Sequence, residues 1–284
     1  MTNKVVYING EYLPSEKASV SIHDLGFLRG YGVFDVMPLV HAIPFLHEDH
    51  WKRLEKSAWE LGLHIPVSRE DHSQIIQELL RQSEGGAHGS IRTILTGGVS
   101  MNGFLPENKE TFCVLLEKAH QFPVSVYEKG VHIETLEYKR DFPLAKTTNY
   151  ITPIQYKRRN EHKKDIFEIL YVWEDKVLEA STSNICIIKD GALFTPYDDV
   201  LGGITRLMTL RLAREENMEV YGQDVSKEEL FSADEVFLTA SNKGIVPVVA
   251  VDGKTIGGGT PGPLTQKLLG KYQDFMKNYT GEEE

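Results

Sequence analysis

Six strand-like segments occupy the second half of the chain, and three helical patterns lie among and after them. The strand-like segments are rich in β-branched and aromatic residues and span residues 131–137, 166–173, 184–188, 192–195, 235–240 and 245–250. The helical patterns, with apolar residues three and four positions apart, span residues 151–161, 205–217 and 263–279. In the middle pattern, Leu207, Leu210 and Ala213 are expected to face inward. Asp190-Gly191 and Asp252-Gly253 predict hairpin turns, so this half of the chain predicts a strand-rich domain.

The first half of the chain mixes strands with helices. Asn9-Gly10 predicts a hairpin turn, because both residues tolerate the positive φ angles that a tight turn needs. An amphipathic helix is expected over residues 47–63, and a second helix is expected from Ser68, which forms a capping signal with Asp71, to about residue 82. Two alternating segments that follow predict strands over residues 90–96 and 111–116. This order predicts a small α+β domain.

The length of 284 residues is enough for two moderate domains, each with its own core. Residues 119–126, which include Pro123, are the best candidate for a linker. We therefore expect a small domain over residues 1–118 and a larger domain over residues 127–284.

Composition excludes several classes of function. The net charge is −10, with 31 basic and 41 acidic residues, so the field of the whole molecule would repel nucleic acid. No apolar run approaches the ~20 residues needed to cross a bilayer, and no signal peptide opens the chain, so we expect a soluble, cytoplasmic protein. Cys113 and Cys186 lie in apolar, strand-like runs and are expected to be reduced core residues. The ten histidines show neither an HExxH pattern nor clustering with cysteine, so we expect no metal.

Three glycines interrupt an aromatic-rich segment over residues 26–35. Glycine lets the backbone approach a ligand or a partner closely, which favours a site here. A strand with bulges explains the same pattern equally well, so both interpretations stay open.

Several scattered residues together match the needs of one cofactor, pyridoxal 5'-phosphate (PLP). Its aldehyde requires a lysine amine, which Lys146 can supply, and its pyridine nitrogen requires a carboxylate, which Glu179 can supply. Its phosphate requires backbone N–H groups at a helix start, hydroxyls and a cation. The candidates for the phosphate are Gly202-Gly203-Ile204-Thr205-Arg206, Ser241 and Arg53. Taken singly, each has an ordinary interpretation, such as a surface carboxylate, a turn hydroxyl or a solvated helix arginine.

At these residues the chain resembles the class IV (fold type IV) PLP-dependent aminotransferases. That family includes branched-chain aminotransferases, D-amino acid aminotransferases and aminodeoxychorismate lyases. The resemblance extends from Val33-Phe34-Asp35 to Ile245-Val246-Pro247-Val248 and is most specific at Lys146, Glu179 and the Gly-Ile-Thr-Arg segment. It implies an α+β fold with a small α/β domain and a larger, strand-rich pseudo-barrel domain that binds PLP. It also implies a homodimer whose sites are completed by both chains.

The resemblance also implies roles for single residues. Lys146 forms the Schiff base with PLP and then moves the proton between the substrate Cα and the C4' of the cofactor. Glu179 keeps the pyridine nitrogen protonated, and Thr182 is placed near the ring. The groups that hold the phosphate are Arg53, Ser241 and the main-chain N–H groups of Ile204 and Thr205.

Substrate recognition departs from the familiar patterns of the family. The short spacing between Lys146 and Asn149 is similar to that of the D-amino acid aminotransferase and lyase branches. Phe34 stands where D-amino acid aminotransferases have a carboxylate-binding tyrosine, and their Arg-x-His pair is missing. Arg29 and Pro38 stand where branched-chain enzymes have a tyrosine and an arginine.

Arg29 and Arg92 are our candidates for binding the substrate carboxylate, because guanidinium forks suit carboxylates. We expect Arg29 to reach the site across a dimer interface. Phe34 and Asn242 complete the predicted set of substrate-binding residues. The alternative for Arg92 is a strand arginine paired with a surface acid.

Three functions follow from these residues. The first is transamination between a D-amino acid, of the D-alanine or D-glutamate type, and a 2-oxo acid such as 2-oxoglutarate or pyruvate. The second is a branched-chain L-amino acid aminotransferase, which Phe34 and the Ser-Ile-Arg segment at Arg92 favour. The third is a protein that does not transaminate, either an aminodeoxychorismate lyase-like enzyme or an inactive binding module.

Overall fold

The computed structural model describes residues 5–83, 89–163 and 165–281. The chain divides into two compact units. Unit 1 comprises Met1–His120, Leu144–Tyr150 and Tyr279–Glu284, and unit 2 comprises Gln121–Pro143 and Ile151–Asn278. The division predicted from the sequence is continuous along the chain. The observed division is not, because the segment that contains Lys146 packs with the first part of the chain.

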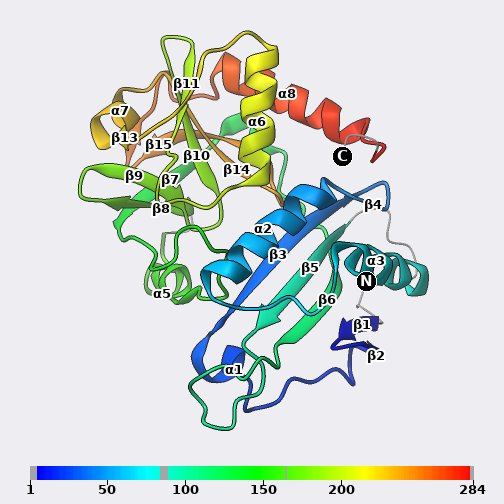
Figure 1. Ribbon diagram of the computed structural model, residues 1–284. Coiled ribbons are helices and arrows are strands. Elements are labelled where there is room, and N and C mark those ends of the chain that lie inside the picture. The colour runs from blue at the N-terminus through cyan, green and yellow to red at the C-terminus, as the bar shows by residue number, and fades with distance from the viewer. Residues whose placement is uncertain (1–4, 84–88, 164, 282–284) are drawn as a thin grey trace. The chain divides into compact units, whose positions relative to one another are not determined.

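Unit 1 is built, among the described residues, on a six-stranded antiparallel sheet (Figure 1). In sheet order its strands are β2 (Glu11–Pro14), β1 (Val5–Ile8), β6 (Thr111–Lys118), β5 (Gly89–Thr96), β3 (Gly32–Val40) and β4 (Ile43–Pro44). The predicted hairpin is confirmed: Asn9 and Gly10 have φ angles of 48° and 96°. The two predicted strands are confirmed as β5 and β6.

Two helices, α2 (His47–Glu60) and α3 (Arg69–Gln82), pack against this sheet and share one core with it. Trp51 and Leu54 of α2 meet Ile76 of α3 in that core, and burying each such side chain contributes roughly 1.5–3 kcal/mol. Ser68 accepts a hydrogen bond from the Asp71 N–H, and Asp71 accepts one from the Ser68 N–H. Both predicted helices and the predicted capping box are confirmed.

Residues Leu25–Arg29 form a short helix, α1, so the bulged-strand interpretation is wrong for this part of the glycine-rich segment. The cause is Asp24, whose buried carboxylate accepts hydrogen bonds from the Gly26 N–H at 2.7 Å and the Thr111 hydroxyl at 2.6 Å. Gly30, with a φ of 66°, ends the helix. Strand β3 begins only after it.

Unit 2 is built on a ten-stranded sheet, again counting only described residues. In sheet order its strands are β12 (Val220–Gly222), β11 (Ala192–Thr195), β10 (Asn184–Lys189), β14 (Glu235–Ala240), β15 (Gly244–Val251), β7 (Val131–Glu137), β8 (Ile166–Trp173), β9 (Lys176–Ala180) and β13 (Val225–Ser226), with β16 (Lys254–Thr255) paired to β15. The six predicted strands are confirmed. The sequence did not predict β9, the strand that carries Glu179.

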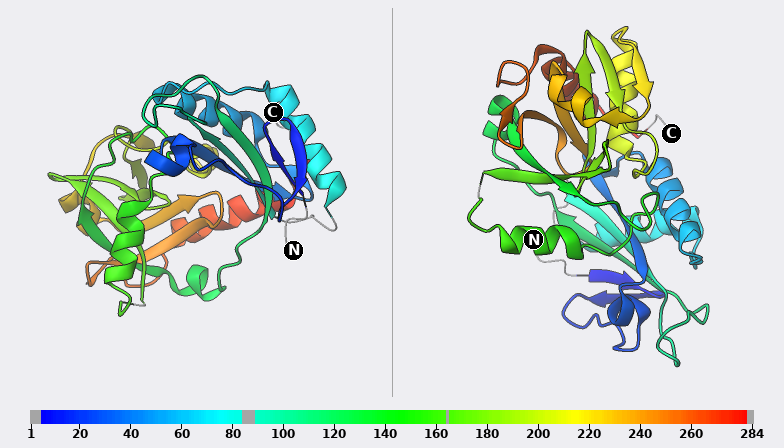
Figure 2. Two further views of the ribbon diagram at one scale, coloured as in Figure 1. Left: turned by 90° about the horizontal axis from the view of Figure 1, so that it is seen from below. Right: turned by 90° about the vertical axis from the view of Figure 1, so that its left-hand side faces the viewer.

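Helices α6 (Ile204–Glu215) and α8 (Pro263–Lys277) pack on each other and on β14, and α8 also runs along β15 (Figure 2). The part of the chain that the structure describes holds three further helices: α4 (Ser125–Lys129), α5 (Ile151–Arg159) and α7 (Lys227–Ser232). Leu210 and Ala213 are buried as predicted, but Leu207 is 53% exposed. The buried stripe of α6 instead includes Met208, which lies about 100° around the helix from Leu207.

Cys113 and Cys186 are both described, and both are buried free thiols, as predicted. None of the helices in the described residues is both long and apolar enough to span a bilayer.

Candidate active site

Lys146 lies in unit 1, on a segment that pairs with strand β3. Its carbonyl oxygen accepts a hydrogen bond from the Phe34 N–H at 2.9 Å, and its own N–H donates to the Ser57 hydroxyl at 3.0 Å. Two residues on, the Thr148 N–H donates to the Gly32 carbonyl at 2.9 Å. The backbone is therefore held at both sides of the lysine, and the Lys146 Nζ atom lies 4.8 Å from the centre of the Phe34 ring.

Phe34 also contacts Arg92. The guanidinium carbon of Arg92 lies 5.3 Å from the centre of the same ring, which is itself buried. Arg92 donates from Nε to Glu117 at 2.7 Å, so the ion pair that the alternative interpretation expected is present. That bond uses one of the five N–H donors of the guanidinium. A strong anion-binding group and the amine of Lys146 therefore share one aromatic ring.

Arg53 is buried, so the ordinary interpretation of a solvated helix arginine is wrong. Its Nε and Nη2 atoms donate to the two carboxylate oxygens of Asp35 at 2.7 and 3.0 Å. Burial raises the pKa of Asp35, but Arg53 and His50 outweigh it and hold the pKa below its usual value. Among the described residues, Nη1 of Arg53 has no hydrogen-bond partner, so an anion can still bind there. The predicted contact of Arg53 with the phosphate stays a prediction.

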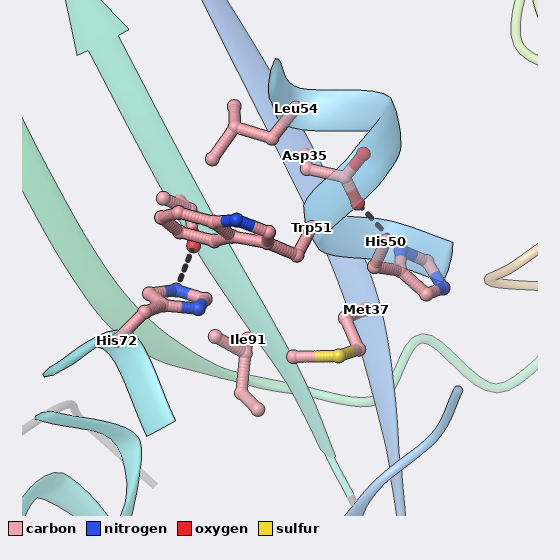
Figure 3. A pocket seen from close by; sticks show the side chains of 8 residues that line it. Asp35, Met37, His50, Trp51, Leu54, His72 and Ile91 are labelled. Atoms are coloured by element: carbon pink, nitrogen blue, oxygen red, sulfur yellow. Dashed lines mark hydrogen bonds and ion pairs between the residues drawn. The ribbon is translucent and has the colours of Figure 1, made fainter. Parts of the chain in front are cut away.

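A small cavity of about 10 Å³ lies beside this pair, lined in part by Asp35, His50, Trp51 and His72 (Figure 3). This volume is close to the minimum that holds one water molecule, so the cavity cannot take a pyridine ring. The Nε2 atom of His72 forms a hydrogen bond with the Thr93 hydroxyl at 2.9 Å, and its Nδ1 atom forms one with Nε2 of His47 at 3.0 Å. Burial, followed by the charge of His47, lowers the pKa of His72 to about 3. No pattern in the sequence marked this histidine pair.

Glu179 lies in unit 2, on strand β9, and is buried. Its Oε1 atom accepts hydrogen bonds from Nε of Arg140 at 2.7 Å and from Nη2 of the same residue. Its Oε2 atom accepts a hydrogen bond from the Leu201 N–H at 3.0 Å and a long one from Asn184 at 3.5 Å. The carboxylate is therefore fixed in orientation, and Oε2 has the capacity for a better donor. Arg140 was missed by the sequence analysis.

The Gly-Ile-Thr-Arg segment forms the start of α6, as the sequence predicted. Gly203 is the residue at the N-cap, and no described side chain caps the helix there. A Cβ atom on Gly203 would lie 1.8 Å from the Asn184 Oδ1 atom, so a larger residue cannot replace it without a shift. The first N–H groups of an α-helix have no partner inside the helix, which leaves those of Ile204 and Thr205 suited to an anion.

Thr182 and Ser241 lie on two turns of unit 2. Thr182 is in the turn between β9 and β10, where its hydroxyl donates to Glu168 and accepts from Lys243 at 2.9 Å. Ser241 begins the turn over residues 241–243 between β14 and β15, and Asn242 in the same turn is exposed. No local sequence pattern marks Glu168 or Lys243.

Arg29, the last residue of α1, is exposed and donates from Nε to the Gly103 carbonyl at 3.1 Å. Large apolar side chains on α1 and on the loop around Gly103 are also exposed: Phe27, Met101, Phe104 and Leu105.

Unit 1 thus holds Lys146, Arg53 and the candidate substrate residues Arg29, Phe34 and Arg92. Within unit 1, the structure brings Lys146 and Arg92 to the ring of Phe34. Unit 2 holds the remaining candidates: Glu179, Thr182, Ile204, Thr205, Ser241 and Asn242.

Residues 32–251 match the family model of the class IV aminotransferases. The chain belongs to this family. A Methanocaldococcus jannaschii relative, provisionally named a branched-chain-amino-acid aminotransferase, is 32% identical over 96% of this chain and 97% of its own length. The D-alanine aminotransferase of Bacillus licheniformis is 29% identical over 98% of this chain and 99% of its own. The structure of the T.th. branched-chain amino acid aminotransferase with pyridoxamine 5'-phosphate matches with a TM-score of 0.90 and 26% identity, over 99% of this chain and 97% of that one.

Class IV aminotransferases use PLP, and the residues of this chain fit that cofactor. Lys146 has a backbone fixed by hydrogen bonds, which suits a residue that must hold the aldehyde carbon. Glu179 is a buried, oriented carboxylate, and α6 presents uncapped N–H groups among the described residues. The two-domain α+β fold expected from the sequence is confirmed by the structural relatives.

Proposed function

We propose that this class IV aminotransferase moves an amino group between a D-amino acid, of the D-alanine or D-glutamate type, and a 2-oxo acid such as 2-oxoglutarate or pyruvate. The observation that carries the proposal is the arrangement around Phe34, where Arg92 and Lys146 contact the same ring. This arrangement would put a carboxylate-binding group beside the amine that acts on the substrate. The short Lys146-Asn149 spacing and the likeness to D-alanine aminotransferases support the same substrate class.

When bound, PLP supplies an electron sink for the electrons released at the substrate Cα. The ε-amine of Lys146 would hold the cofactor aldehyde and, as a free amine, would move the proton between the substrate Cα and the cofactor. Glu179 would accept a hydrogen bond from the ring nitrogen and so keep the proton there, and Arg140 holds the Glu179 carboxylate in place for it. Thr182 would lie near the ring.

Four groups of this chain hold the cofactor phosphate in this proposal. The buried pair with Asp35 anchors one edge of the Arg53 guanidinium, so the opposite edge meets the anion in a fixed orientation. Ile204 and Thr205 donate their main-chain N–H groups, and Ser241 donates its hydroxyl.

The substrate carboxylate is bound by Arg92 and by Arg29, with Phe34 and Asn242 beside it. We propose that Arg29 comes from the partner chain of a homodimer. Phe27 on α1 is an exposed apolar side chain, and so are Met101 and Phe104 on the loop around Gly103, whose carbonyl accepts a hydrogen bond from Arg29. A second copy of the chain would bury this apolar surface. This placement would make the site incomplete in a monomer.

The second candidate is a branched-chain L-amino acid aminotransferase. Phe34 in place of a tyrosine favours it, and so do the structural relatives, which include the Escherichia coli branched-chain enzyme with a TM-score of 0.89 and 25% identity. The match covers 99% of this chain and 97% of the chain in that structure.

A donor screen that resolves enantiomers, with 2-oxoglutarate as acceptor, separates the candidates. The proposal expects pyruvate and glutamate from D-alanine and no turnover of L-leucine. Turnover of L-leucine alone would establish the second candidate. Pyruvate and ammonia released from D-serine by loss of water, with no glutamate formed, would indicate a lyase. Borohydride reduction of the holoprotein should place the phosphopyridoxyl label on the peptide that contains Lys146, and a label on any other peptide would overturn the mechanism.

A further inference from the structure

Lys243 and Glu168 form a buried ion pair in unit 2 that the proposed chemistry does not use. Each side chain is 3% exposed. The Lys243 ammonium donates to the Oε1 atom of Glu168, which also accepts hydrogen bonds from the hydroxyls of Thr182 and, at 3.2 Å, Ser183. Among the described residues, Oε2 of Glu168 has no partner. One carboxylate oxygen is therefore the common acceptor for three side chains.

Three segments that are distant in the sequence meet at this pair. Glu168 lies on β8, Thr182 and Ser183 lie in the turn before β10, and Lys243 ends the turn before β15. The rings of Phe167 and Phe122 lie 5.3 and 5.9 Å from the ammonium. The ammonium lies among these rings and donates to both Glu168 and Thr182, so its charged hydrogen bonds link the two turns.

Stability alone does not explain a pair of this kind. Removing two charges from water costs about as much free energy as their attraction returns, and well-packed apolar residues often serve as well. Apolar residues cannot, however, orient the hydroxyl of Thr182 or fix the turn that carries Ser241. The pair therefore fits a role in which geometry matters more than stability.

We propose that Lys243 is a positioning residue for the cofactor. Through Glu168 and Thr182 it holds the turns over residues 181–183 and 241–243 in one arrangement, so that Thr182 and Ser241 are already in place when PLP binds. Preorganised contacts of this kind raise affinity because less ordering is required on binding. The inference rests on the proposed function, in which Thr182 and Ser241 contact PLP.

The test compares wild-type protein with Lys243→Met and with Lys243→Met/Glu168→Met. Two quantities are measured: the Kd of PLP for each apoprotein, by fluorescence titration, and the Tm of each apoprotein, by calorimetry. Lys243→Met is expected to weaken PLP binding by roughly tenfold or more and to lower the Tm, because Glu168 is left buried without its counter-charge. The double variant is expected to recover the Tm while its PLP binding stays weak.

The matched control is Lys176→Met, which breaks an exposed ion pair with Asp224 in the same unit and should change neither quantity. Two results would show that the pair serves only stability. One is a double variant that binds PLP as tightly as the wild type, and the other is a single variant whose Tm falls while its Kd for PLP is unchanged. Loss of cooperative unfolding in both variants would likewise overturn the positioning role. Each of these outcomes leaves the proposed function intact. Wild-type protein that takes up no PLP would instead overturn the proposed function and this inference together.

Discussion

Arg53 and Asp35 form a buried, two-pronged ion pair, in which Nε and Nη2 of the arginine donate to both oxygens of the carboxylate. The pair fixes the plane of the guanidinium. Because one edge is anchored and Nη1 is left without a partner among the described residues, the opposite edge is set to meet an anion. The arrangement buries the positive charge of Arg53, and the Asp35 carboxylate is the counter-charge that offsets the cost of burying it.

We expect Asp35→Ala to lower the free energy of unfolding by about 3–5 kcal/mol, because Arg53 would keep a buried charge without a partner. Asp35→Ala/Arg53→Met should recover most of that loss. Urea unfolding followed by circular dichroism measures both. Arg81→Ala, which removes an exposed ion pair with Glu78, is the control and should change little. Equal losses in the single and double variants would contradict the account.

Arg92→Leu should raise the KM for D-glutamate and lower kcat/KM by roughly 10- to 100-fold, because losing a hydrogen bond to a charged group costs roughly 1.5–3 kcal/mol of binding free energy. Steady-state kinetics with D-glutamate and pyruvate measure this. Glu117→Gln is the control, because it removes the ion-pair partner of Arg92 and keeps the arginine. If the two substitutions have the same effect, Arg92 acts only through its ion pair.

Arg140→Met should lower kcat by roughly tenfold, because the Glu179 carboxylate loses two charge-assisted hydrogen bonds and its fixed orientation. The kcat is measured at saturating PLP so that weaker cofactor binding does not contribute. Lys139→Met tests the adjacent residue, which pairs with partly exposed Asp199, and it should leave kcat unchanged. An unchanged kcat in Arg140→Met would remove Arg140 from the mechanism.

The stability of the protein should fall as the pH is lowered from about 6.5 toward 3. His72 is buried and its pKa is lowered to about 3 in the folded state, so the unfolded state binds its proton first on acidification. The loss from this residue should reach about 2 kcal/mol at pH 5. Urea unfolding at pH 7, 6 and 5 measures the free energy of unfolding, which should change less steeply with pH in His72→Gln than in the wild type.

The control for this prediction is His64→Gln, since the His64 side chain is 78% exposed and lies in the same unit. Its slope with pH should stay close to that of the wild type. A His72→Gln variant with an unchanged slope would show that another group causes the acid sensitivity.

Much of the fold could be predicted from local patterns. Ser68 and Asp71 marked a helix start because a capping box needs only residues three positions apart. Asn9-Gly10 marked a hairpin for a similar local reason. Helix α1 was missed because its cause, Asp24, is held by Thr111, 87 residues away. Leu207 was misplaced because the buried face of α6 depends on what packs against it.

The candidate site divides in the same way. Motif spacing predicted Lys146, Glu179 and the start of α6 as cofactor residues. Arg140 could not be assigned to Glu179, because the two are 39 residues apart and meet only through the order of strands in the sheet. Lys243 and Glu168 are 75 residues apart, and no local pattern marks either.

By itself, the sequence determined most of the secondary structure, the family and the residue types that a PLP enzyme needs. These properties depend on spacings of a few residues and on backbone angles that single residues prefer. Only the tertiary structure decided that the Lys146 segment packs against β3 and which charges are buried in pairs. An ion pair forms between residues that strand order and helix packing bring within a few ångströms, and that proximity is not encoded in any short stretch of the chain.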